Sequence, residues 1–342
     1  MHADPRPVFR PPSPNPAWLA QYREDALDPA LPIVDPHHHL WERDGEQYYL
    51  DALLADLETG HNVVATVFVQ CMWAYRTSGP EALRPVGETE FVAGIADEAE
   101  RRRTRTRVCA GIVGHADLCL GGGVEEVLAA HVAAAGGRFR GIRHLTARSE
   151  DFIASIAVTP PARLMAEPAF RDGFARLGSF GLSFDAWLYH TQIAELTDLA
   201  RAYPDTPIVL DHVGGPMGIG PYEGRRDAVF ADWRRDMKRL ATCPNVTVKL
   251  GGLAMLVAGF GFHQRPVPPS SQELAAAWRP YMDACIEDFG ASRCMFESNF
   301  PVDKAMCSYA VLWNAFKRIA AGASPAEKAL LFHDVAARVY RL

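Results

Sequence analysis

The chain has 342 residues, of which 49% are apolar and 22% charged, a balance typical of globular proteins with a substantial core. The formal net charge is -6 and the basic residues form no long stripe, so nucleic acid is not expected as a partner. The first residues contain no apolar segment like that of a signal peptide or a membrane span, which predicts a cytoplasmic protein without membrane contact. Whether the chain forms a homo-oligomer is left open.

The N-terminal segment is rich in proline, with six prolines among its first 16 residues. Such a composition favours an extended, solvated backbone over a packed element. We therefore expect residues 1–30 to form an extended arm laid over the surface. One domain is expected to follow, from residue 31 to residue 342.

From residue 31 onward, short β-branched apolar runs alternate with longer segments of helical period. The eight runs are Pro32–His39, Val63–Gln70, Val108–Val113, Gly141–Leu145, Leu182–Trp187, Pro207–His212, Asn245–Gly251 and Cys294–Asn299. Eight βα units of this kind predict an α/β protein with a single (β/α)8 TIM barrel. Long connections, such as residues 146–160, suggest a lid on one face.

Polar residues end several of these runs, and the carboxyl ends of barrel strands are where active sites lie. His37 and His39 end the first run, and side-chain alternation should place them on one face with Asp35 while His38 is structural. A pair of histidines at this spacing can bind a metal or donate hydrogen bonds to a substrate carbonyl. His212 ends the sixth run, before a glycine turn that lets a ligand approach.

Arg143 lies in the fourth run and is too costly to bury without a partner, so it should meet either a protein carboxylate or an anionic substrate. Gln70 ends the second run and Trp73 follows it, while His190 lies on a loop that could close over a ligand. These four residues are the predicted substrate contacts. Trp41, Trp187 and Tyr189 also follow strand ends and could line an apolar pocket.

The segments "DPHHHLW", "GIRH", "LDHVGGP", "NVTVKLGGL" and "CMFESNFP" together resemble the amidohydrolase superfamily, and more narrowly its lactonase branch, which includes 2-pyrone-4,6-dicarboxylate lactonase and L-fuconolactonase. The resemblance covers nearly all of residues 31 to 342. It implies that His37, His39, His212 and Arg143 polarise and hold a lactone. It also implies that an aspartate at the end of the eighth strand activates water, in enzymes that typically need no metal.

This chain departs from that pattern, because Asn299 stands where the aspartate is expected and an amide cannot take a proton from water. Strand alternation places Glu297 on the same face, one layer deeper. Glu297 could belong to a buried network with Lys249 and Asp35, or it could act as the base or as a metal ligand. Asp303 is a third candidate carboxylate, on the following loop.

These residues predict a hydrolase that acts on a small carbonyl substrate, most simply a lactone, with the carbonyl polarised by His37, His39 and His212. Two alternatives remain: a metal-dependent decarboxylase of the same superfamily, and a barrel that binds a ligand after losing its base. The same three histidines could hold a divalent metal such as zinc, with Glu297 as a fourth ligand. Metal-independent activity is favoured, because the amide of Asn299 is a poor ligand for a divalent cation.

Overall fold

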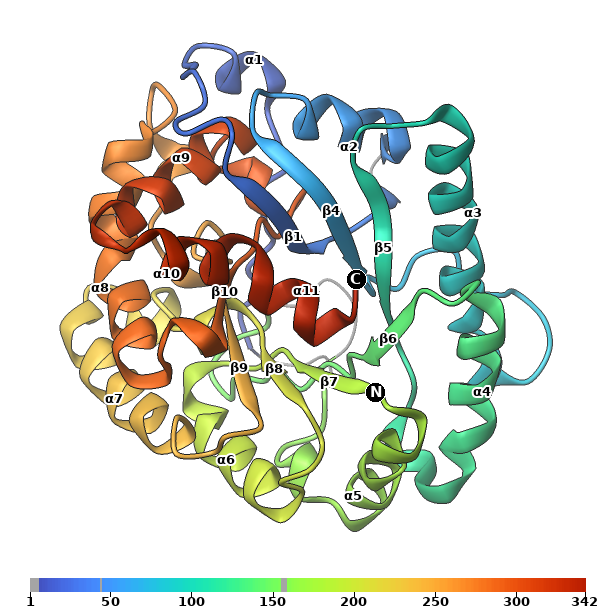
Figure 1. The fold of residues 1–342 in the computed structure, drawn as a ribbon. Coiled ribbons are helices and arrows are strands. Elements are labelled where there is room, and N and C mark those ends of the chain that lie inside the picture. The colour runs from blue at the N-terminus through green and yellow to red at the C-terminus, as the bar shows by residue number, and fades with distance from the viewer. Residues whose placement is uncertain (1–5, 44, 155–158) are drawn as a thin grey trace.

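The computed structural model describes residues 6–43, 45–154 and 159–342, and its main sheet contains eight parallel strands. In their order around the sheet these are β1 (Pro32–His38), β4 (Asn62–Val69), β5 (Arg107–Gly114), β6 (Phe139–Ile142), β7 (Ser183–Ala186), β8 (Ile208–Leu210), β9 (Val246–Leu250) and β10 (Cys294–Phe296). The segment just after β10 meets the end of β1, where the peptide N–H of Asn299 donates to the carbonyl of His37 over 2.9 Å. The predicted (β/α)8 barrel is therefore confirmed (Figure 1).

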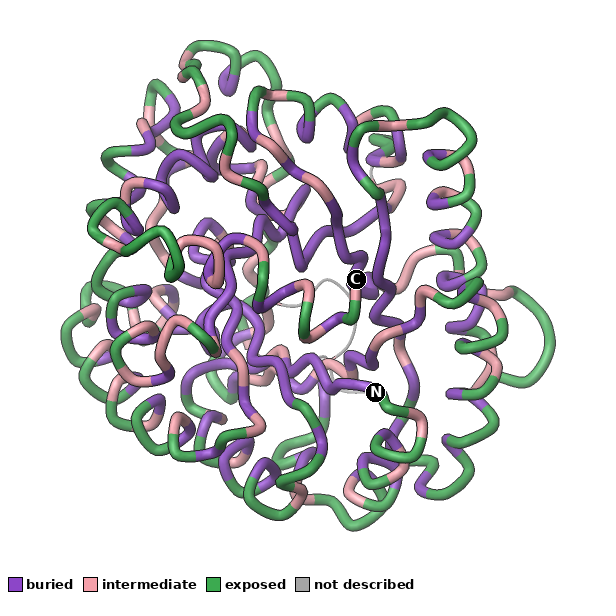
Figure 2. Tube along the Cα trace, in the orientation of Figure 1, coloured by how far each residue is buried: buried purple, intermediate pink, exposed green. Residues whose placement is uncertain are grey.

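Helices surround the barrel and cover the outer faces of its strands (Figure 1). Those that follow strands in the chain are α2 (Leu50–Leu57), α3 (Val86–Arg102), α4 (Val124–Ala134), α5 (Pro168–Ala175), α6 (Ile193–Ala202), α7 (Arg226–Leu240), α8 (Ser271–Phe289) and α9 (Tyr309–Ile319). The strands are buried almost throughout, whereas the helices alternate between buried and exposed residues (Figure 2). This is the pattern of strands enclosed on both faces by helices and by the barrel interior.

The loop after β1 forms a hairpin that the sequence did not predict. Its strands β2 (Trp41–Arg43) and β3 (Glu46–Tyr48) pair antiparallel. The segment is too short and too polar to show a clear strand period, so pattern reasoning assigned it to a loop. The hairpin places Trp41 and Arg43 beside the carboxyl ends of the strands.

The C-terminal helices α10 (Pro325–Ala329) and α11 (Val335–Tyr340) cross one end of the barrel (Figure 1). A Ser324 and Glu327 capping box begins α10, as the sequence "SPAE" suggests. Val335 and Tyr340 pack with barrel-interior residues such as Val34. The C-terminal helices therefore close the amino-terminal end of the barrel.

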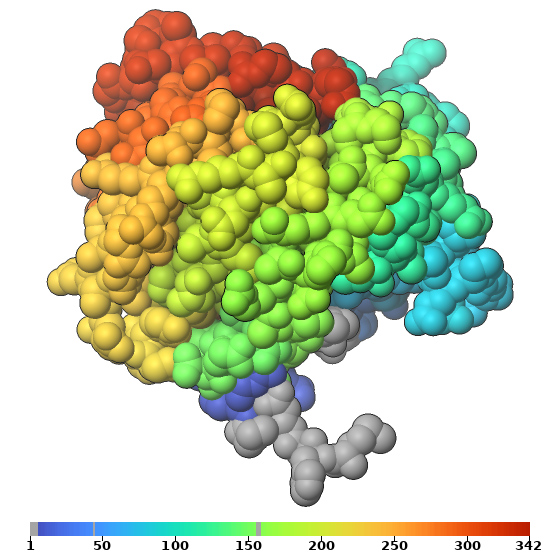
Figure 3. Space-filling model, turned by 90° about the horizontal axis from the view of Figure 1, so that it is seen from below, coloured from blue at the N-terminus to red at the C-terminus, as the bar shows by residue number. Residues whose placement is uncertain are grey.

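The N-terminal arm lies at the opposite end of the molecule from these helices (Figure 3). Val8 pairs with Ile153 in an isolated parallel bridge, and the N–H of Phe9 donates to the carbonyl of Ile153 over 2.8 Å. Beyond Asn15 the backbone forms the short helix α1 (Pro16–Leu19), with the Asn15 side chain accepting from the N–H of Trp18. Within the described residues, no helix combines the length and the apolar character needed to cross a membrane.

Candidate active site

A cavity of about 140 Å³ lies at the carboxyl ends of the strands. The polar side chains that line it are His39, Arg43, Gln70, Arg143, His212 and Asn299. Five of these six were predicted site residues from strand ends, and the barrel brings them together from five different strands. No acidic residue is among those that line the cavity in the described part of the chain.

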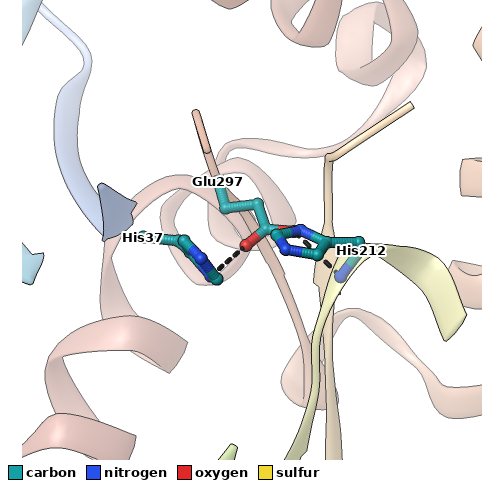
Figure 4. A group of neighbouring side chains, drawn as sticks. All are labelled: His37, His212 and Glu297. Carbon is teal, nitrogen blue, oxygen red and sulfur yellow. Dashed lines mark hydrogen bonds and ion pairs between the residues drawn. The ribbon is translucent and has the colours of Figure 1, made fainter. Parts of the chain in front are cut away.

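Glu297 contacts two histidines, His37 and His212 (Figure 4). One carboxylate oxygen, Oε1, accepts hydrogen bonds from Nδ1 of His212 at 2.7 Å and from the His212 peptide N–H at 3.0 Å. The other oxygen, Oε2, lies 2.9 Å from Nδ1 of His37. Glu297 and His37 are fully buried and do not line the cavity, whereas His212 does.

The contact with Glu297 determines which nitrogen of His212 carries the proton. A carboxylate can only accept, so Nδ1 is the donor and a neutral ring leaves Nε2 as an acceptor. No described residue is hydrogen-bonded to Nε2, and the side chain faces the cavity. His212 therefore presents a lone pair to a bound molecule.

The ionisation of this pair follows from burial and from mutual attraction. Burial alone would raise the pKa of Glu297, but the charges and hydrogen bonds of His212 and His37 lower that pKa to about 2. Burial lowers the pKa of His212, although the charge of Glu297 partly opposes the shift. At neutral pH the pair is a carboxylate and a neutral imidazole.

His39 presents a second lone pair to the cavity by the same reasoning. Its Nδ1 lies 2.7 Å from the carbonyl oxygen of Val69, which can only accept, so Nδ1 carries the proton. The ring stacks on Trp41 with 5.4 Å between centroids. Burial, with the nearby charges of His37 and Arg143, holds the pKa of His39 well below its ordinary value.

Lys249 is fully buried below the histidines and pairs with two aspartates. Its Nζ lies 2.7 Å from Asp185 and 3.0 Å from Asp211, and 3.1 Å from Nδ1 of His37. Burial would lower the pKa of Lys249, but the two aspartates outweigh it and raise that pKa. The Tyr340 hydroxyl donates to Asp185 over 2.6 Å, so α11 joins the same network.

Asp35 does not belong to this network, so its predicted pairing with Lys249 is wrong. Its oxygens accept from the hydroxyl of Tyr309 on α9 at 2.9 Å and from the N–H of Ser298 at 3.0 Å. The register of β1 against β4 shifts between Asp35 and His38. Regular alternation is lost there, and Asp35 does not share the face of His37.

Arg143 meets a protein carboxylate, one of the two partners that the sequence left open, and contact with an anionic substrate stays a prediction. Its Nη1 lies 3.4 Å from Asp211 and 3.2 Å from Nε2 of His37, and its Nη2 donates to the carbonyl of Gln70. A guanidinium only donates, so Nε2 of His37 accepts from Arg143. The side chain also lines the cavity, and no described residue accepts the second hydrogen of Nη2.

Asn299 lines the cavity, and Asp303 holds its side chain. The amide Nδ2 donates to Asp303 Oδ1 over 2.8 Å, which leaves the amide oxygen free for the cavity. Burial raises the pKa of Asp303 well above its ordinary value. Asn299 and His212 both have φ near +55°, a left-handed conformation that non-glycine residues adopt mainly under tertiary constraint.

The remaining predicted contacts separate into two groups. Trp41, Trp187 and Tyr189 line the cavity, as the sequence suggested. Trp73 and His190 are not among the lining residues: the N–H of Trp73 donates to Glu88, and Nδ1 of His190 accepts from the N–H of Met217. A part in substrate contact for these two stays a prediction.

Two glycines after β9 allow the histidine and the glutamate to approach. A Cβ added to Gly252, which has φ +68°, would lie 2.5 Å from the His212 side chain, and one added to Gly251 would lie 2.4 Å from Cγ of Glu297. Both positions therefore require glycine. The two glycines of "KLGG" are the local sequence signal for this close approach.

Sequence reasoning also missed Phe9, Pro11 and Pro12, which line the cavity from the arm. Asp185 lies within a strand and Tyr340 near the C-terminus, so neither carried a local signal that links it to the site. Their role depends on contacts between segments far apart in the sequence.

His37, His212 and Glu297 offer ligand atoms within 4.8 Å of one another, and imidazole and carboxylate are common zinc ligands. Their positions fit a divalent ion poorly. Glu297 is already paired with both histidines, and Lys249 Nζ and Arg143 Nη1 lie 3.1 Å and 3.2 Å from the two ring nitrogens of His37. A cation added here would be repelled by two fixed positive charges.

A family model for amidohydrolases matches residues 34–342 of the chain. An uncharacterized protein, y4mH, from Sinorhizobium fredii is 34% identical, over 91% of this chain and 99% of that protein. An L-fucono-1,5-lactonase from Burkholderia multivorans is 26% identical, over 90% of this chain and 96% of that enzyme. The crystal structure of a zinc-bound amidohydrolase from Burkholderia multivorans superimposes with a TM-score of 0.71, at 24% identity, over 91% of this chain and 99% of that one. The protein therefore belongs to the amidohydrolase family and is a hydrolase of that family.

Proposed function

We propose that this hydrolase opens a small lactone by adding water to the ring carbonyl, with His212 as the general base. The observation that carries the proposal is the 2.7 Å contact between His212 Nδ1 and Glu297, which leaves the Nε2 lone pair facing the cavity. A neutral imidazole held in this way can take a proton from water, and the carboxylate stabilises the imidazolium that forms.

Asn299 orients the water. Because its Nδ2 donates to Asp303, its Oδ1 can accept one hydrogen of a water molecule in the cavity, while His212 Nε2 accepts the other. A lone pair of the water oxygen is then directed at the carbonyl carbon. The amide does not replace the missing aspartate as a base; it positions the nucleophile.

Arg143 stabilises the oxyanion. It is a buried cation that lines the cavity, and its Nη2 has a hydrogen that no described residue accepts. While the two rings are neutral, Nε2 of His39 and Nε2 of His212 carry a lone pair and no hydrogen, so neither can donate a hydrogen bond to a carbonyl. We therefore move the polarising role from the histidines, to which the sequence assigned it, to Arg143.

The proton passes from water to His212 Nε2 as the new carbon–oxygen bond forms. When the tetrahedral intermediate breaks its ring bond, the imidazolium returns the proton to the departing alkoxide, and the product is a hydroxy acid. Glu297 stays ionised throughout, as its lowered pKa requires. Each step uses side chains alone, so activity is expected without a metal.

The test is acid release from a panel of five- and six-membered lactones, with and without a chelator. We expect hydrolysis that survives chelation, and a loss in kcat/KM of roughly 10²- to 10⁴-fold in His212→Asn. Carbon dioxide release in place of acid release would establish a decarboxylase instead. Tight binding without turnover would establish a binding protein.

The variant Glu297→Gln distinguishes an effect of Glu297 on His212 from a general loss of fold stability. Because the charge of Glu297 raises the pKa of His212, removing that charge should move the acidic limb of the kcat/KM profile to lower pH while the plateau falls. A variant that only weakened the fold would lower the plateau without moving the limb. An unshifted limb would therefore refute the assignment of His212 as base.

A further inference from the structure

The N-terminal arm forms part of the cavity wall. Phe9, Pro11 and Pro12 line the cavity although they precede the first barrel strand by at least 20 residues. They also precede residue 34, where the match to the family model begins. This part of the wall therefore comes from outside the segment that the family model matches.

Contacts in the described residues hold the arm in place. The N–H of Phe9 donates to the carbonyl of Ile153 over 2.8 Å, and the N–H of Ile153 donates to the carbonyl of Pro7 over 2.9 Å. Arg6 donates to the carbonyl of Ser149. The arm thus pairs with the loop after β6 as a short parallel ladder.

An unbroken series of aromatic contacts connects the arm to His212. Phe9 packs edge-on against Phe152 at 5.6 Å, and Phe152 lies 6.1 Å from Tyr189. Tyr189 lies 5.6 Å from Trp187, which packs edge-on against His212 at 4.7 Å. The apolar wall therefore begins at the proposed base and ends on the arm.

We propose, on the basis of the proposed lactonase function, that the arm is a specificity element that selects lactones with an apolar substituent. The polar floor of the cavity is used by the reacting carbonyl and the water. Phe9, Pro11 and Pro12 offer apolar contact on the arm side, and among the described residues no acidic side chain lines the cavity. The volume of about 140 Å³ is close to that of a cavity that holds benzene, so one ring with a short side chain fits.

The test compares three lactones of equal ring size: unsubstituted δ-valerolactone, δ-octanolactone with its propyl substituent, and a polyhydroxylated sugar 1,5-lactone. The wild type should show the highest kcat/KM for δ-octanolactone. Phe9→Ala should lower that value by roughly 10-fold or more, as expected for loss of an apolar pocket contact. Hydrolysis of δ-valerolactone should change by less than about 2-fold, because the wall does not contact an unsubstituted ring.

Val8→Ala is the matched control, because Val8 lies in the same bridge with its side chain 58% exposed. It should leave all three activities unchanged. Phe9→Leu should retain most of the preference for the propyl substituent. Equal losses for δ-valerolactone and δ-octanolactone in Phe9→Ala, or a wild type that prefers the sugar lactone, would overturn the proposal.

Binding of a propyl-substituted δ-lactam, measured by calorimetry, tests the arm without turnover. If the wild type hydrolyses none of the lactones, the proposed function fails, and the lactam still decides the role of the arm. Binding about 10-fold weaker in Phe9→Ala than in Val8→Ala would support an apolar specificity wall. Equal binding by the two variants would refute it.

Discussion

Asn299 differs from the aspartate that the lactonase resemblance predicts, and its neighbour Asp303 explains how an amide is accommodated. The amide donates to a buried carboxyl group over 2.8 Å. An aspartate at position 299 would place two carboxyl groups in contact, and two such groups share one proton. The local packing therefore favours an amide.

This pair gives the first prediction. Burial raises the pKa of Asp303, so its carboxyl group stays protonated to higher pH in the folded protein than in the unfolded chain. The free energy of unfolding therefore falls as pH rises. Asn299→Asp should extend that fall to higher pH, with a free energy of unfolding close to wild type at pH 5 and clearly lower at pH 9. The swapped double variant Asn299→Asp, Asp303→Asn should restore the wild-type slope. Urea unfolding at both pH values measures these free energies. The same dependence of the free energy of unfolding on pH in the wild type, the single variant and the double variant would contradict the prediction.

The loop between β4 and α3 supplies part of the cavity wall and is held by a buried glutamate on α3. One oxygen of Glu88 accepts from the N–H of Cys71 at 3.0 Å and from that of Trp73 at 2.8 Å. Cys71 and Met72 line the cavity. Burial raises the pKa of Glu88 to about 7, although the two N–H groups and Arg143 oppose the shift.

Glu88→Gln is the second prediction. The folded-state pKa of about 7 exceeds the ordinary 4.5, so in the wild type stability is lost as pH rises from about 4.5 to about 7. Glutamine keeps an oxygen for both N–H groups but carries no charge. The variant should therefore gain stability relative to wild type between pH 5 and pH 8, by about 1–3 kcal/mol in the free energy of unfolding.

Glu90→Gln, on the same helix, is the control for that measurement. Arg76 lowers the pKa of Glu90, so this carboxylate contributes stability above its unfolded pKa. Its loss should make the variant slightly less stable than wild type at both pH 5 and pH 8. If Glu90→Gln and Glu88→Gln gained the same free energy of unfolding relative to wild type at pH 8, the effect would not be specific to the buried group.

At the scale of the whole molecule, buried charges link the two ends of the barrel. Tyr340 on the C-terminal helix contacts Asp185, Lys249 joins Asp185 to Asp211, and Asp211 contacts Arg143 at the cavity floor. All five side chains are buried, and the buried charges of Asp185, Asp211, Lys249 and Arg143 need their partners to remain charged. The barrel interior is therefore held by ion pairs in its middle layer and by apolar packing below it.

Lys249→Met is the third prediction. It leaves Asp185 buried without its cation and Asp211 with Arg143 alone, which should cost about 3–5 kcal/mol in the free energy of unfolding. The control is Arg235→Ala on α7, whose side chain is 53% exposed and paired with Asp232 and Asp236. That exposed pairing is screened by solvent and should contribute much less to stability. Urea unfolding of both variants decides this, and comparable losses would show that the buried network is not needed for stability.

The barrel and its strand ends could be predicted because periodicity is a local signal. Runs of β-branched residues separated by helical segments determine a (β/α)8 order, and the carboxyl ends then converge by topology. His39, Gln70, Arg143, His212 and Asn299 were found in this way, and alternation placed Glu297 correctly below Asn299.

The sequence alone thus determined the fold, the end of the barrel that holds the site, and most residues of its floor. Only the tertiary structure decided which side chains contact one another. Asp35 contacts Ser298 and Tyr309 in place of Lys249, and the choice between donor and acceptor nitrogen on His212 depended on a carboxylate 85 residues away. The arm became a wall of the cavity through contacts with a loop more than 140 residues later. Such pairings carry no local period, because they depend on which segments closure of the barrel brings into contact.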